Sequence, residues 1–124
     1  PSLTVDMVAG VRERWSRYHN LYEQLFDNFE MVANTGLAAI TDGDYRTLGD
    51  MMTINHGLLN AISVSSPELD LMVQLARDAG SLGAKLTGAG GGGSVACLCD
   101  NDEGSANVAG ALTRAGYQAL QVTV

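Results

Sequence analysis

The sequence has few cysteines, and they do not form a recognisable metal site. Cys97 and Cys99 are the only two, and they stand two residues apart in a strand-like segment. Neighbours at this spacing on a strand point the same way and do not easily reach disulfide geometry. Neither histidine, His19 or His56, forms a ligand pattern with them. We therefore expect two buried thiols and no metal site.

Long apolar runs and a basic charge balance are also absent. No stretch approaches the roughly 20 apolar residues that span a bilayer, and the first residues lack the layout of a signal peptide. The 14 acidic and 7 basic residues give a net charge of −7, which repels nucleic acid and anionic membrane surfaces. We expect one cytoplasmic domain of 124 residues that binds neither nucleic acid nor membranes.

The first two thirds of the chain have helical periodicity. Apolar residues recur at three- and four-residue steps, which predicts amphipathic helices. Ser66-Pro67-Glu68 is a strong helix start, because serine caps free amides and proline suits the first helical position. The predicted helices cover residues 3–40 with a break near 18–20, about 44–62, the segment between Ser66 and Gly80, and later a short segment from about 100 to 112.

Strand-like alternation replaces the helical period after Gly80. Residues 84–87, 95–99 and 117–124 are predicted as strands, the last with Leu120, Val122 and Val124 on one face. Helices followed by strand, loop, strand, helix and strand imply an α+β fold with helices packed on one face of a small antiparallel sheet. Three strands make a thin sheet, which a strand before Leu3 would complete.

A glycine-rich segment, residues 88–93, separates the first two predicted strands, and we call it the glycine run. Successive backbone amides in such a loop can bind an anion without side chains in the way. The alternative is a plain connection, or close packing of two domains. From composition alone the two readings are even. The candidate phosphate-binding residues are Gly88, Ala89, Gly90, Gly91, Gly92, Gly93 and Ser94.

Residues 54–70, together with the run from Gly83 to Gly93, resemble the C-terminal half of the GHMP kinase superfamily and, within it, the mevalonate kinases. The glycine run matches the third motif of that family. Its position between a capped helix and an apolar strand makes the match specific. Ser2-Leu3-Thr4 also resembles the family, so the likeness covers nearly the whole chain. Ser94 departs from the pattern, since mevalonate kinases often have cysteine there.

The resemblance implies a ferredoxin-like C-terminal domain, residues 1–124, of a kinase that transfers phosphate from ATP, with Mg²⁺, to a mevalonate-like alcohol in isoprenoid biosynthesis. The family's nucleotide-phosphate loop and its catalytic aspartate and lysine belong to the N-terminal half, and nothing in this sequence matches them. The resemblance therefore implies no catalytic residue in this chain. It also implies that the N-terminal half is a required partner and that the chain alone is inactive.

Four further residues are weaker candidates. Lys85, the only lysine, could neutralise phosphate, although strand alternation more often sends such a side chain to solvent. Thr87, like Ser94, could bind phosphate or satisfy the backbone of the loop. Asn55, with His56, either faces the acceptor pocket or forms a structural pair, which we expect. Thr4 either caps the first helix or contacts the acceptor.

Other functions stay open at this level. Phosphomevalonate, homoserine and sugar kinases resemble one another in this half of the family. A non-catalytic α+β module that holds a ligand or partner with the glycine run is an alternative from a different class. The kinase interpretation predicts an exposed apolar face where the N-terminal half docks, through which the isolated chain would self-associate, for example as a homodimer.

Overall fold

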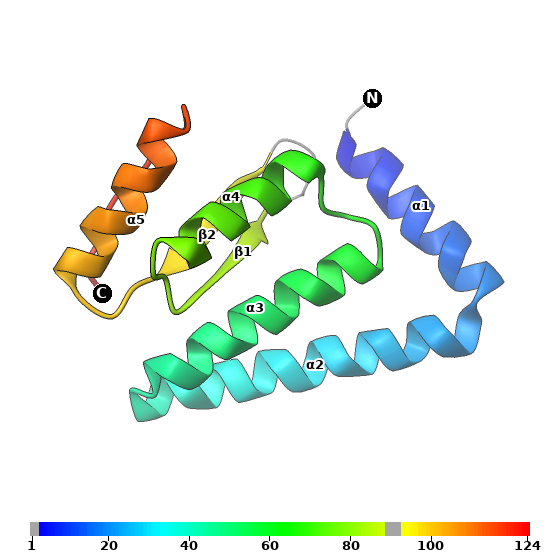
Figure 1. The fold of residues 1–124 in the computed structure, drawn as a ribbon. Coiled ribbons are helices and arrows are strands. Elements are labelled where there is room, and N and C mark those ends of the chain that lie inside the picture. The colour runs from blue at the N-terminus through cyan, green and yellow to red at the C-terminus, as the bar shows by residue number, and fades with distance from the viewer. Residues whose placement is uncertain (1–2, 89–92) are drawn as a thin grey trace.

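Most of the chain outside the glycine run is helical. The computed structural model describes residues 3–88 and 93–124, with side chains from Val5 onward. In this part, helices precede, and one helix follows, a single β-hairpin (Figure 1). The elements are α1 Leu3–Arg17, α2 His19–Asp42, α3 Tyr45–Ala61, α4 Pro67–Asp78, β1 Gly83–Thr87, β2 Ser94–Leu98 and α5 Asp102–Arg114.

Local capping chemistry explains where the helices begin. The Asp44 side chain accepts a hydrogen bond from Thr47 N at 3.1 Å at the start of α3. Ser66 Oγ does the same for Leu69 N at 3.2 Å at the start of α4. Each side chain satisfies an amide that has no partner within its helix. The predicted break near residues 18–20 and the predicted start at Ser66 are both confirmed.

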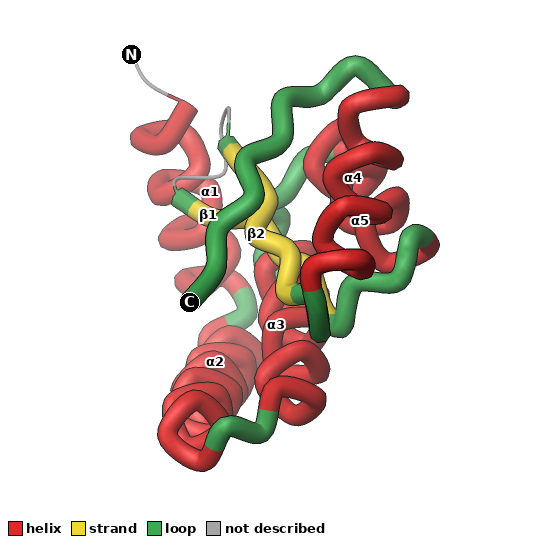
Figure 2. Tube along the Cα trace, turned by 90° about the vertical axis from the view of Figure 1, so that its left-hand side faces the viewer, coloured by secondary structure: helices red, strands yellow, loops and turns green. Residues whose placement is uncertain are grey.

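The hairpin is antiparallel, with Lys85 opposite Ala96 and Thr87 opposite Ser94. Ala84 and Leu86 are 0% and 2% exposed, whereas the alternating Lys85 and Thr87 are half-buried. Helices α4 and α5 lie on one side of the strands (Figure 2). The buried core between them consists of Val73, Ala76, Ala84, Val108 and Leu112. The predicted α+β class, with helices covering one face of a small sheet, is confirmed.

The third predicted strand is wrong. Residues 117–124 form neither helix nor strand, and Leu120 and Val122 are 89% and 73% exposed. Alternation shows which side chains share a face, but a strand also needs a neighbouring backbone within hydrogen-bond distance. A groove of about 500 Å³ is lined by both β2 and residues 117–122. The described sheet therefore has two strands.

Arg14 connects α1 to the far end of α3. Its Nε donates to the hydroxyl of Tyr22 at 3.0 Å, and its Nη2 donates to the carbonyl oxygen of Ile62 at 2.8 Å. Helix α2 packs along α3 as an antiparallel pair (Figure 1). Among the described helices, none is both long and apolar enough to cross a membrane.

Candidate functional site

The hairpin brings the two ends of the glycine run together. Thr87, the last residue of β1, is paired with Ser94, the first residue of β2. Gly88 has a φ of +75°, a left-handed conformation that favours glycine over other residues. Gly93 and Ser94 also line the groove beside β2. The remaining candidates, Ala89, Gly90, Gly91 and Gly92, lie outside the described residues.

Lys85 and Thr87 lie on the same face of β1, because alternate strand residues point the same way. Lys85 is half-buried rather than fully exposed. Partial burial lowers the pKa of its ammonium group, since removal from water disfavours the charged form. No carboxylate in the described ranges forms an ion pair with it. The lone lysine thus stands without a neutralising partner in this part of the chain, two residues before Thr87.

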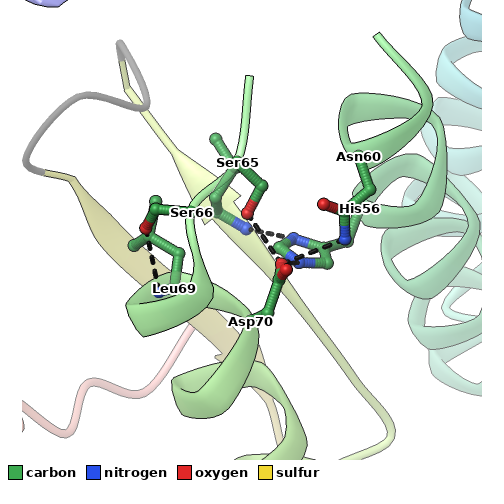
Figure 3. A network of polar contacts seen from close by, with 7 residues as sticks. His56, Asn60, Ser65, Ser66, Leu69 and Asp70 are labelled. Carbon is green, nitrogen blue, oxygen red and sulfur yellow. Dashed lines mark hydrogen bonds and ion pairs between the residues drawn. The ribbon is translucent and has the colours of Figure 1, made fainter. Parts of the chain in front are cut away.

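His56 is buried behind β1, at 6% exposure. Its Nδ1 accepts a hydrogen bond from Leu86 N at 3.1 Å, and its Nε2 lies 2.8 Å from Asp70 Oδ1 (Figure 3). A backbone amide can only donate, so Nδ1 carries no proton and Nε2–H donates to the carboxylate. The expected structural pairing is therefore correct for His56.

Asn55 differs from its neighbour His56 on α3. Its Oδ1 is buried and has no hydrogen-bond partner among the described residues. Its role, at the acceptor pocket or within the fold, stays a prediction. Thr4, the other weak candidate on a helix, has a side chain outside those described.

Asp70 is the polar centre of this region, and sequence reasoning missed it. In addition to His56, its Oδ1 accepts from Asn60 Nδ2 at 3.0 Å and from Ser65 Oγ at 2.8 Å (Figure 3). Partial burial raises its pKa, but the hydrogen bonds from Ser65, His56 and Asn60 together outweigh burial and hold the pKa below its usual range. An ordinary aspartate is already ionised at neutral pH, and the lowered pKa keeps Asp70 ionised in more acidic solution as well.

The sequence carried only one signal for Asp70, its place in the first turn of α4. An acidic residue there is sufficiently explained by the helix dipole. Its partner His56 is 14 residues away on another helix, so no local spacing relates the two.

Two glycines set how closely α3 approaches β1. Gly49 on α3 and Gly83 on β1 pack backbone against backbone, with no room for a Cβ on either. A second hollow, of about 570 Å³, lies between α3 and α4, where Asp50, Thr53, Gln74 and Arg77 contribute to its lining.

A family model described as the GHMP kinases C terminal matches residues 37–118. A mevalonate kinase from Methanothermobacter thermautotrophicus is 43% identical over 96 residues, which cover 77% of this chain and 32% of the relative. A mevalonate kinase from Thermococcus onnurineus is 40% identical over 118 residues, or 91% of this chain and 35% of the relative. The chain thus spans about a third of the length of these curated relatives.

Solved structures give the same result. The crystal structure of L. major mevalonate kinase in complex with R-mevalonate matches with a TM-score of 0.84 and 30% identity, covering 92% of this chain and 35% of that one. The Methanococcus jannaschii mevalonate kinase structure matches with a TM-score of 0.72 and 29% identity, covering 92% and 33%. Both similarities extend over nearly the whole chain.

Proposed function

Because this chain belongs to the GHMP kinase family, whose C-terminal model matches residues 37–118, we propose that it forms the C-terminal part of a mevalonate kinase. The complete enzyme transfers the γ-phosphoryl group of ATP to the hydroxyl of mevalonate. The observation that carries the proposal is the likeness to mevalonate kinases, at 43% identity over 96 residues in one relative and 40% over 118 in another.

The contribution of this chain is the glycine run. Catalysis of phosphoryl transfer depends mostly on positioning and on stabilising the charge of the transferring group. Backbone amides next to glycines can supply part of this, because no side chain blocks the approach of a phosphate. The left-handed Gly88 and the paired Thr87 and Ser94 support this role. Lys85 adds one positive charge on the face of β1 that it shares with Thr87.

The catalytic groups belong to the rest of the enzyme in this proposal. Among the residues described, no group of three or more His, Cys, Asp or Glu side chains could hold a metal ion. We assign no ligand of the ATP-bound Mg²⁺ to this part of the chain. Its role is to place amides of the glycine run, and one wall of the acceptor pocket, against groups that the N-terminal half contributes.

The groove beside β2 is the contact that we propose for that half. In the described sheet, β2 has β1 as its only strand neighbour. Its other edge has no strand neighbour in that sheet, and the groove beside β2 is also lined by α5 and by residues 117–122, of which Leu120 and Val122 are exposed. A strand from elsewhere in the polypeptide would pair with β2 there and cover these apolar residues. Hydrogen exchange of the complete enzyme tests this. The proposal expects the β2 amides on the edge away from β1 to be protected, and rapid exchange of those amides would contradict it.

An acceptor panel tests the substrate. The full-length enzyme would be assayed for ADP release with mevalonate, phosphomevalonate, homoserine and galactose at equal concentrations. The proposal expects turnover with mevalonate and a kcat/KM at least about a hundredfold lower with the others. The reason is that the wrong substrate leaves buried polar groups of the site without hydrogen-bond partners. Preference for a different alcohol would keep the family and overturn mevalonate as substrate. Turnover with none would favour a binding module.

A further inference from the structure

His56 connects the strand that leads into the glycine run to two helices. It belongs to α3, accepts a hydrogen bond from the backbone amide of Leu86 on β1, and donates one to the carboxylate of Asp70 on α4. We propose that His56 and Asp70 are positioning residues. They hold β1 in place and thereby determine where the glycine run begins relative to the active site. This inference rests on the proposed kinase function.

The first argument is the match between α3 and β1. Two of the contacts between these elements are Gly49 against Gly83 and His56 against Leu86. Seven helical residues rise about 10.5 Å, and three strand residues span about 10 Å. The helix and the strand therefore keep the same spacing between their two contacts. A slip of β1 by one residue would break both contacts at once.

The second argument is the direction of the hydrogen bonds. The backbone amide of Leu86 donates to Nδ1 of the imidazole, and this hydrogen bond is buried. Nδ1 can accept it only when Nδ1 is unprotonated and the proton of the neutral ring is on Nε2. The Asp70 carboxylate selects that arrangement by accepting from Nε2 at 2.8 Å. Asn60 and Ser65 hold the same carboxylate oxygen, so the ring is oriented by a group that is itself fixed.

The third argument is proximity to the glycine run. Leu86 is the last residue but one of β1, and Gly88 follows two residues later. Thr87, between them, is paired with Ser94 at the other end of the run. A displacement of the Leu86 amide would therefore also move Thr87 and its partner Ser94, which flank the two ends of the run. A misplacement of about 1 Å in a catalytic arrangement can cost a hundredfold in rate.

The test uses variants of the full-length enzyme. Glutamine can accept from Leu86 with its Oε1 and donate to Asp70 with its Nε2, so H56Q retains both hydrogen bonds. Leucine retains volume and loses both, as H56L. Ala39 is 4% exposed on α2, and it lines neither of the two hollows. A39G, which puts glycine inside a helix, therefore controls for loss of stability at a site outside β1 and α4.

Kinetics at a temperature where every variant is folded separate positioning from stability. We expect H56L to lower kcat/KM for ATP by about tenfold or more, as for a buried amide left without its partner. H56Q should stay within about threefold of the wild type, and A39G should be unchanged. Equal activity of H56L and A39G, or a loss in H56Q as large as in H56L, would overturn the proposal.

Hydrogen exchange gives a second readout that does not depend on turnover. Peptides covering residues 83–87 of the full-length chain should exchange faster in H56L than in A39G, and at the wild-type rate in H56Q. If H56L does not fold, D70A, which leaves the ring without its acceptor, takes its place with the same expectations. If the wild type phosphorylates no acceptor, the proposed function fails, and the exchange data alone decide whether His56 fixes β1.

Discussion

Gly49 on α3 and Gly83 on β1 are in backbone contact. A Cβ on Gly49 would lie 2.5 Å from the carbonyl oxygen of Leu82, and a Cβ on Gly83 would overlap the carbonyl oxygen of Gly49. Helix α3 therefore lies as close to β1 as two backbones allow. This closeness also brings the imidazole of His56 within hydrogen-bond distance of Leu86.

The first prediction concerns this contact. Gly49→Ala should destabilise the fold by about 2 kcal/mol or more, because the new methyl group meets the backbone of Leu82, which cannot move aside. Gly57→Ala is the matched control, since Gly57 lies on the same helix with open space around it. Alanine there should be neutral or stabilising by up to about 1 kcal/mol. Urea unfolding measures both, and equal effects would contradict the packing argument.

The second prediction concerns Ser63, which has a φ of 62° between α3 and α4. A left-handed conformation costs a non-glycine residue about 1–2 kcal/mol, whereas glycine adds about 0.5–1 kcal/mol of unfolded-state entropy. Ser63→Gly should therefore stabilise the protein by about 0.5 kcal/mol. Gly43→Ala, at a φ of 68°, should act in the opposite direction. Thermal midpoints that shift in the same direction for both variants would contradict the left-handed backbone conformation at these two positions.

The third prediction is a pH dependence at Asp70. Its folded pKa is below the unfolded value of about 3.9. The stabilisation is therefore fully present above the unfolded pKa and is lost as the pH falls through the folded one. The difference in unfolding free energy between the wild type and D70N should be largest at neutral pH and should shrink below about pH 4. Asp27→Asn, at an exposed carboxylate, controls for the loss of one negative charge.

The fourth prediction concerns the thiols. Burial, with a smaller effect of neighbouring Cys99, raises the pKa of Cys97 to about 11, and burial also raises the pKa of Cys99. Only the thiolate reacts with a disulfide reagent. Both cysteines should react with DTNB at pH 7.5 much more slowly in the native enzyme than after unfolding. The Cys99→Ser variant isolates Cys97, and rapid native reaction of that variant would show that its thiol is not held protonated.

Local signals sufficed for most of the fold. The Ser66-Pro67 start predicted α4 because capping and the proline position act within one turn. The stem of the glycine run was predicted because alternation in residues 84–87 and an apolar stretch at 95–99 are properties of each strand alone. The role of the run itself remains a proposal.

Features that depend on distant residues could not be predicted. The alternation of Leu120, Val122 and Val124 gave no information on whether a neighbouring backbone lies close enough to form a ladder. The Gly49–Gly83 contact and the His56–Asp70 pair join residues on different elements, and only the packing of α3 against β1 and α4 relates them. Asp70 in particular had a sufficient local explanation at its helix start.

The most direct test is mevalonate-dependent ADP release by the full-length enzyme, with the 124-residue chain assayed in parallel. We predict turnover by the full-length enzyme and none by the shorter chain, because the catalytic groups are proposed to lie in the N-terminal half. Turnover by the shorter chain, or no turnover with mevalonate by the full-length enzyme, would contradict the account.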